Sequence, residues 1–207
     1  MSPILNKIFL LRHGETVWNT EKRLQGVLDS PLTSRGREQV KMYGAWLSNV
    51  LQGQPIQLVS SPLPRCQTSA SIIAPMLELT PAAITVDDRL RELSFGDWQG
   101  QKVDDIITTD ALRYYSREAD LWEVAAPQGE SFRDASIRLG SWLSDNRRTT
   151  IVVISHGCVG QILRGLHADM NSKQITALDH RHGIIYVLGL GGGIESVAVA
   201  DHINIAV

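Results

Sequence analysis

Two histidines and two arginines stand just after short apolar runs, and their side chains suit the chemistry of phosphate. Arg12 and His13 directly follow one run, His156 follows a second after a single serine, and Arg65 lies five residues beyond a third. Arginine binds phosphate oxygens in pairs through its planar fork. A neutral imidazole is a nucleophile that can hold a phosphoryl group covalently. If these four side chains meet, they form a pocket for a compact dianion.

The apolar runs are predicted to be buried strands, because they are brief and almost continuously apolar. They comprise residues 8–11, 56–60 and 151–154. Ligands of open α/β sheets bind beyond the carboxyl ends of the strands, where the N-termini of helices also point. If the three strands are neighbours, the four residues therefore converge on one spot.

Longer helical patterns separate these strands. The other expected elements are helix 34–50, helix 64–77, strand 84–86, a helical segment at 101–122, helices 131–146 and about 157–166, and a hairpin formed by 184–190 and 194–200. Strands that alternate with helices predict parallel βαβ units. We therefore expect an α/β fold, namely a three-layer α/β/α sandwich around a mostly parallel six-stranded sheet with a C-terminal antiparallel hairpin.

The length of 207 residues suits one globular domain. We expect a single domain over residues 1–207, with an inserted helical lobe at about 101–128 above the pocket. The segment 78–134 holds thirteen acidic and six basic residues, so the net charge of −2 is a cancellation between an acidic lobe and a cationic pocket. This distribution favours a small phosphorylated metabolite as partner and disfavours nucleic acid.

Cysteine content and hydropathy argue against several other classes. Cys66 and Cys158 lie far apart without CxxC spacing, so a disulfide scaffold or a structural zinc site is poorly supported. The apolar neighbours of Cys158 favour packing over nucleophilic catalysis. The N-terminus lacks a secretory pattern, and no apolar stretch approaches the ~20 residues of a membrane span. We expect a cytoplasmic protein with reduced thiols and no membrane association.

Cleavage of a phosphate ester also needs a proton for the departing alkoxide. Glu92 is the strongest candidate donor, because its apolar neighbours would desolvate the carboxyl and favour the protonated form. Asp87, Asp88 and Asp97 remain alternatives on physical grounds alone.

The segment His180-Arg181-His182 carries two histidines that could share a face and bind a metal. Because no cluster of acidic residues or cysteines accompanies them apart from Asp179, a position at the border of the pocket is favoured.

Residues 10–19, LLRHGETVWN, resemble the signature of the histidine phosphatase superfamily, the phosphoglycerate-mutase-like proteins. The resemblance continues in order at residues 23–26, 29–33, 36, 60–66, 92–100, 129–131 and 155–157. It implies that His13 is the phosphorylated nucleophile and that Arg12, Arg65 and His156 complete the phosphate pocket. Glu92 would act first as the general acid and then as the base that activates water.

The resemblance also implies contacts with the substrate. Asn19 would bind phosphate, and Gln25, Gly26 and Gly157 would lie at the edge of the substrate. The family needs no metal or other cofactor.

Phosphatases and mutases share the phosphohistidine step and differ in what receives the phosphoryl group. Glycolytic mutases resemble one another in a longer segment, rich in arginine and proline, between the acid and the second histidine. Here only 64 positions separate Glu92 from His156, and the lobe between them is acidic. We therefore favour a phosphomonoester hydrolase over a phosphoglycerate mutase. A non-catalytic phospho-ligand-binding module would have lost the nucleophile or the acid, and both are present.

The identity of the substrate and the oligomeric state, including a homodimer, stay open. Candidate specificity residues are Arg113, Arg117 and His182. The two arginines are four residues apart and would share one helix face. They could hold a second anionic group, or only pair with Glu118 and Asp120.

Overall fold

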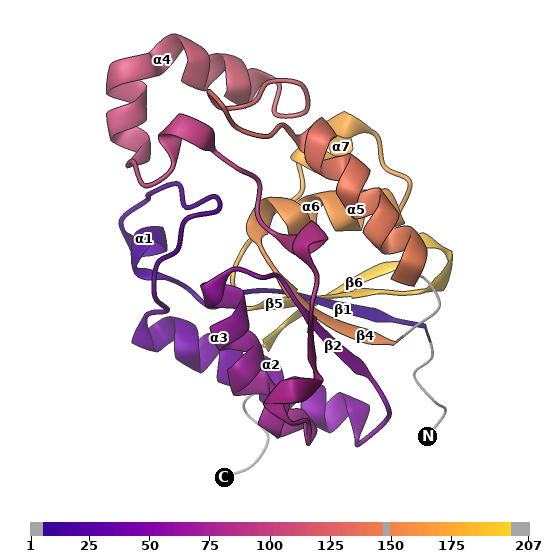
Figure 1. The fold of residues 1–207 in the computed structure, drawn as a ribbon. Coiled ribbons are helices and arrows are strands. Elements are labelled where there is room, and N and C mark those ends of the chain that lie inside the picture. Colours follow the sequence, from indigo (N-terminus) through magenta and orange to yellow (C-terminus); the bar gives the residue numbers. More distant parts are fainter. Residues whose placement is uncertain (1–5, 147–149, 200–207) are drawn as a thin grey trace.

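A six-stranded mixed sheet runs through the centre of the molecule in the computed structural model, which describes residues 6–146 and 150–199 (Figure 1). The strands are β1 (Ile8–Arg12), β2 (Gln57–Ser60), β3 (Ile84–Val86), β4 (Ile151–Ser155), β5 (Ile184–Leu188) and β6 (Ile194–Ala198). Their order is β3-β2-β4-β1-β5-β6. The first four of these are mutually parallel, whereas β5 pairs antiparallel with both β1 and β6. The expected sheet and C-terminal hairpin are confirmed, while residue 200 of the expected hairpin lies outside the described residues.

Helices cover both faces of this sheet (Figure 1). The α-helices are α1 (Val17–Thr20), α2 (Ser34–Leu51), α3 (Pro64–Ile73), α4 (Val103–Ala119), α5 (Phe132–Asn146), α6 (Gly157–His167) and α7 (Ser172–Thr176). Short 3₁₀-helices lie at Ala74–Leu77, Pro81–Ala83, Asp88–Leu90, Gly96–Trp98 and Leu190–Gly192. The helix expected at 64–77 is thus an α-helix followed by a 3₁₀ turn, because Pro75 has no backbone N–H for an α-helical hydrogen bond.

Side chains of each strand alternate between the two faces of the sheet, and a hydrophobic core lies on each face. Leu10 and Val153 belong to a cluster with side chains of α5 and α6, whereas Phe9 and Val152 belong to a second cluster with side chains of α2 and α3. Successive side chains of a strand point to opposite faces of the sheet, so each buried strand contributes to both cores. The expected three-layer α/β/α arrangement follows directly.

The segment between the sheet elements β3 and β4 carries α4, which stands away from the sheet beside the end where β1 and β4 finish (Figure 1). It is interrupted at Asp110, whose φ of −145° and ψ of 45° are not helical. A small cluster of Phe95, Trp98, Ile106 and Ala126 packs beneath it. α4 therefore has its own apolar anchor, separate from the two cores of the sheet.

The loop after β1 lies directly against the first turn of α2. A Cβ added to Gly14 would come within 2.3 Å of the carbonyl oxygen of Gly36, and one added to Gly36 would come within 2.1 Å of the carbonyl oxygen of Glu15. The side chain of Thr33 caps α2 by accepting a hydrogen bond from the Gly36 N–H at 2.9 Å. Two glycines and one cap thus hold the end of β1 in place.

No helix among the described residues is both long and apolar enough to span a membrane.

Candidate active site

The carboxyl ends of β1, β2 and β4 are adjacent, as the sequence predicts. Arg12 at the end of β1 pairs in register with Ser155 of β4, and Ser60 of β2 pairs with Ile154. Beyond these ends lies a cavity of about 150 Å³, whose walls include Arg12, His13, Arg65, Glu92 and Gly157. Residues from four separate segments of the chain therefore meet at one site.

His13 is 98% buried and is oriented by two hydrogen bonds. Its Nδ1 lies 2.8 Å from the carbonyl oxygen of Gly14, and its Nε2 lies 3.2 Å from Nε of Arg65. A carbonyl accepts and a guanidinium N–H donates, so the proton belongs on Nδ1 and the lone pair on Nε2. Burial, followed by the charges of Arg65 and Arg12, lowers the pKa of His13 well below its usual value. The ring is therefore neutral at neutral pH, and the nucleophilic lone pair of Nε2 accepts the hydrogen bond from Arg65.

Arg65 is buried in the first turn of α3, directly after the proline at its N1 position. Besides contacting His13, its guanidinium donates hydrogen bonds of 2.7 Å each to the carbonyl oxygens of Gly26 and Leu28. Its backbone N–H donates to Oδ1 of Asp29 at 3.1 Å. Because the fork is held on several sides, it presents a fixed positive charge to the cavity.

Arg12 supplies a second positive charge to the cavity. One of its Nη groups donates a hydrogen bond to the carbonyl oxygen of His180. Its Nε is buried and has no hydrogen-bond partner among the described residues. Since Arg12 lines the cavity, a phosphate oxygen there could accept from this N–H.

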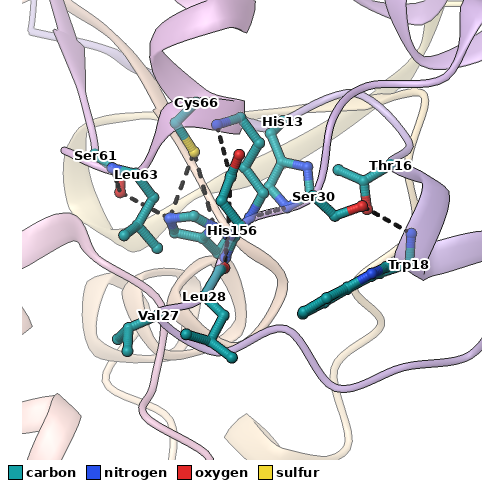
Figure 2. A network of polar contacts seen from close by, with 12 residues as sticks. His13, Thr16, Trp18, Val27, Leu28, Ser30, Ser61, Leu63, Cys66 and His156 are labelled. Carbon is teal, nitrogen blue, oxygen red and sulfur yellow. Dashed lines mark hydrogen bonds and ion pairs between the residues drawn. The ribbon is translucent and has the colours of Figure 1, made fainter. Parts of the chain in front are cut away.

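His156 follows β4 and is also buried (Figure 2). Its ring centroid lies 5.3 Å from that of His13, in an edge-to-face arrangement. Its Nε2 lies 2.7 Å from Oγ of Ser61 and 3.4 Å from Sγ of Cys66. Burial, together with the charge of Arg65, lowers the pKa of His156 well below its usual value. Two neutral imidazoles thus stand beside two guanidinium groups.

Glu92 is the acidic side chain that reaches the cavity. Its Oε2 accepts a hydrogen bond from the Cys158 N–H at 3.4 Å, and its Oε1 accepts from the Leu93 N–H at 3.1 Å. The three alternatives lie elsewhere: Asp87 and Asp88 form ion pairs with nearby arginines, and Asp97 is exposed. The geometry therefore favours Glu92 as the proton donor.

The residues expected at the edge of the substrate also border the cavity: Asn19, Gln25, Gly26 and Gly157. Oε1 of Gln25 is buried without a hydrogen-bond partner among the described residues. Oδ1 of Asn19 accepts from the Thr16 N–H at 3.0 Å, which caps α1. A Cβ on Gly157 would lie 3.4 Å from Cζ of Arg12, an ordinary van der Waals contact, so Gly157 lies directly beside the guanidinium.

The structure separates the candidate specificity residues. Arg113 is exposed and lines neither this cavity nor the larger one beside it, whereas Arg117 is buried and lines the larger one. The ring centroid of His182 lies 5.7 Å from that of His13. Burial and the charge of Arg12 lower the pKa of His182 to about 3. No group of three or more His, Cys, Asp or Glu side chains among the described residues is arranged to hold a metal ion.

Sequence reasoning missed two contributors to the site. Ser61 orients His156, and Phe95 forms part of the cavity wall. Ser61 directly follows β2, so the strand-end argument applied to Arg65 could have found it. The position of Phe95 depends on the packing of distant segments and has no local sequence signal. His180, which was expected at the border of the pocket, does line the cavity, and its carbonyl oxygen accepts a hydrogen bond from Arg12.

Comparison with known proteins agrees with this geometry. The family model described as "Histidine phosphatase superfamily (branch 1)" matches residues 8–201. A relative from Salmonella paratyphi C named "Probable phosphoglycerate mutase GpmB" is 33% identical over 212 residues, covering 96% of this chain and 95% of the relative.

Solved structures show the same fold. A mycobacterial glucosyl-3-phosphoglycerate phosphatase in complex with VO3 superposes with a TM-score of 0.73 at 28% identity, covering 93% of this chain and 96% of that one. Bacillus stearothermophilus YhfR superposes with a TM-score of 0.77 at 29% identity, covering 93% and 95%. With a family model that spans almost the whole chain and a buried histidine–arginine site at the expected strand ends, this chain belongs to the histidine phosphatase superfamily.

Proposed function

We propose that this enzyme hydrolyses the phosphomonoester of a small metabolite through a phosphohistidine on His13. The observation that carries the proposal is the orientation of His13, whose Nε2 lone pair faces Arg65 at 3.2 Å inside a cavity that Glu92 also lines. Nucleophile, cationic clamp and proton donor are therefore within one small volume.

The first step forms a bond between Nε2 of His13 and phosphorus and breaks the bond between phosphorus and the ester oxygen. Arg12 and Arg65 stabilise the negative charge on the phosphoryl oxygens. The protonated carboxyl of Glu92 donates its proton to the departing alkoxide, which leaves as an alcohol.

The second step returns the enzyme to its starting state. Water attacks phosphorus, and the Glu92 carboxylate accepts one proton from that water. The bond between phosphorus and Nε2 breaks, inorganic phosphate leaves, and His13 is again neutral. Every group in this cycle belongs to the chain, so the proposal includes no metal. We expect activity to survive treatment with a chelator, and its loss would contradict this mechanism.

The similarity to a mycobacterial glucosyl-3-phosphoglycerate phosphatase supports hydrolysis. The acidic character of the segment that carries α4 supports it as well, since a mutase must retain an anionic intermediate between its two transfers. Both cysteines are free thiols, which fits the cytoplasmic location that we propose.

A phosphoglycerate mutase is the second candidate. The observation that favours it is the 33% identity with a relative named as such, over 96% of this chain. The two activities share the first step and differ in the acceptor of the second.

One experiment separates the two. Purified enzyme is incubated with 3-phosphoglycerate, and ³¹P NMR follows the products. Release of inorganic phosphate supports hydrolysis, whereas accumulation of 2-phosphoglycerate supports the mutase.

The phosphohistidine is tested in parallel with 4-nitrophenyl phosphate. We expect His13→Ala to abolish turnover and the acid-labile phosphoenzyme seen after rapid quenching. His167→Ala is the matched control, because His167 lies at the C-terminal end of α6, away from the cavity. Turnover by His13→Ala at the wild-type rate would refute the mechanism.

A further inference from the structure

A second, larger cavity adjoins the phosphate site. Its volume is about 640 Å³, and it shares walls with the smaller cavity at Arg12, Phe95 and Cys158. We call it the chamber, and its own walls include Arg117, Leu121, Phe132, Thr176 and Leu178. A phosphomonoester bound at His13 would therefore have its alcohol part directed either into this chamber or out to solvent.

The volume of the chamber bears on the size of that alcohol. Pockets for drug-sized ligands commonly measure about 300–1,000 Å³, a range that includes the chamber but not the cavity of about 150 Å³ at His13. An alcohol of only three carbons would leave most of the chamber without a ligand. The chamber thus has room for an alcohol that carries at least one ring.

The charges at the chamber bear on the charge of the alcohol. Arg117 pairs with Glu118 at 3.3 Å, and Arg181 pairs with Asp179 at 2.6 Å. Burial lowers the pKa of His180, so that side chain is neutral at neutral pH. Among the described residues, each arginine of the chamber other than Arg12 thus has a carboxylate partner. A second anionic group on the substrate would gain little there and would face Glu118 and Asp179.

One buried donor remains for an uncharged polar group. Nε of Arg117 is buried and has no hydrogen-bond partner among the described residues. The guanidinium lies over the ring of Phe95, with Cζ 5.2 Å from the ring centroid, which holds it at the wall. An unpaired buried N–H is unfavourable, and an oxygen of the ligand could satisfy it.

We propose that the chamber binds the alcohol part of the substrate, and that this alcohol is uncharged, contains a ring and carries an oxygen that accepts from Arg117. The inference rests on the proposed hydrolysis at His13 and narrows its substrate class. It also changes the part expected for the arginine pair: Arg117 recognises a neutral acceptor, and Arg113 takes no part.

Four phosphate esters of primary alcohols test this class, since their leaving groups are chemically similar. Propyl phosphate is small and uncharged, 3-phosphoglycerate is small and anionic, cyclohexylmethyl phosphate has an apolar ring, and glucose 6-phosphate has a ring with hydroxyl groups. We expect kcat/KM to be highest for glucose 6-phosphate and lowest for 3-phosphoglycerate. A preference for 3-phosphoglycerate over both ring esters would overturn the proposal.

Filling the chamber tests where the ring binds. Leu178→Trp should lower the ratio of kcat/KM for cyclohexylmethyl phosphate to that for propyl phosphate by about tenfold or more. Leu112→Trp is the matched control, because Leu112 is 85% exposed on α4 and lies outside the chamber. An unchanged ratio in Leu178→Trp would place the ring elsewhere.

Removing the donor tests the part of Arg117. Arg117→Leu should lower the ratio for glucose 6-phosphate over cyclohexylmethyl phosphate by about tenfold, since only the former offers acceptors. Arg117→Lys keeps a donor and should recover part of that ratio. Equal ratios in wild type and Arg117→Leu would contradict the assignment.

Binding measurements separate failure of this inference from failure of the proposed function. Calorimetry on His13→Ala gives the Kd of each ester without turnover. If the wild type hydrolyses none of the esters but the variant binds the ring esters more tightly, the hydrolase proposal fails and the chamber assignment stands. If the wild type hydrolyses propyl phosphate but the variant binds all four esters equally, the chamber assignment fails alone.

Discussion

The Nε–H of Arg65 donates a hydrogen bond to Nε2 of His13, with 3.2 Å between the two nitrogens. The lone pair that would attack phosphorus is thus occupied by the cation that would hold the phosphate. When a phosphoryl group arrives, its oxygens can accept from Arg65 and release the nitrogen. Clamping of the substrate and release of the nucleophile would therefore be one event.

Arg65→Lys should lower kcat/KM by about 10²- to 10³-fold, because lysine keeps the charge but loses the fork that contacts His13 and the loop carbonyls. The measurement is steady-state hydrolysis of 4-nitrophenyl phosphate. Arg113→Lys, on the exposed surface of α4, should leave kcat/KM unchanged. A loss below threefold in Arg65→Lys would show that its charge alone suffices.

Glu92→Gln should affect esters according to their leaving groups. An alkyl alcohol needs a proton as it departs, so hydrolysis of propyl phosphate should fall by about 10²- to 10⁴-fold. 4-Nitrophenolate leaves without a proton, so stopped-flow absorbance should still show a burst of nitrophenolate followed by slow turnover. Asp97→Asn is the control, since Asp97 is exposed. Loss of the nitrophenolate burst itself would argue against Glu92 as the acid.

Stability should depend on pH through the buried histidines. Burial lowers the pKa values of His13, His156 and His182, with the charge of Arg65 or Arg12 as the next cause. In the unfolded chain these rings have ordinary pKa values of about 6.5 and take up protons that the folded chain does not. The free energy of unfolding is therefore fully retained above pH ~6.5 and falls as the pH drops below it.

Urea denaturation at pH 7, 6 and 5 measures this dependence. Each such group contributes up to about 1.4 kcal/mol per pH unit below its unfolded pKa. For His182, whose folded pKa is about 3, the contribution should persist throughout this range. His182→Gln should therefore reduce the slope. An identical slope in wild type and His182→Gln would contradict this assignment.

Tyr43→Phe should destabilise the segment that borders His13. The Tyr43 hydroxyl, on α2, accepts a hydrogen bond of 2.6 Å from the Gly183 N–H. Burial raises the pKa of Tyr43 to about 12, so the hydroxyl stays neutral. Removing it leaves a half-buried N–H without that acceptor, which should cost about 1–2 kcal/mol in urea denaturation. Tyr115→Phe, at an exposed position of α4, should cost nothing measurable.

The strand-end residues were predictable because their positions follow from sheet geometry alone. Once β1, β2 and β4 are parallel neighbours, residues 12, 13, 65 and 156 must lie close together. The sequence determined the acid less firmly, since three aspartates remained alternatives to Glu92, and only the tertiary structure brings Glu92 to the cavity.

Contacts between distant segments could not be predicted in this way. Nothing in the local sequence indicates that Tyr43 binds Gly183, because the contact depends on how α2 packs against the segment before β5. The same holds for the arginines of α4. Their spacing predicts a shared helix face, but whether that face is buried depends on the cluster around Phe95, and it is buried only at Arg117.

The partner of His13 Nδ1 is a main-chain carbonyl, that of Gly14. Every amino acid carries this acceptor, so no change of side-chain chemistry at position 14 deletes it. What position 14 cannot accept is bulk, because a Cβ there would collide with Gly36. Substitutions therefore cannot remove the acceptor that fixes the tautomer of His13. The chamber, in contrast, is lined by side chains, and each of them can be substituted separately. Enzymes of this kind could therefore change their substrate during evolution while they keep the same nucleophile in the same orientation.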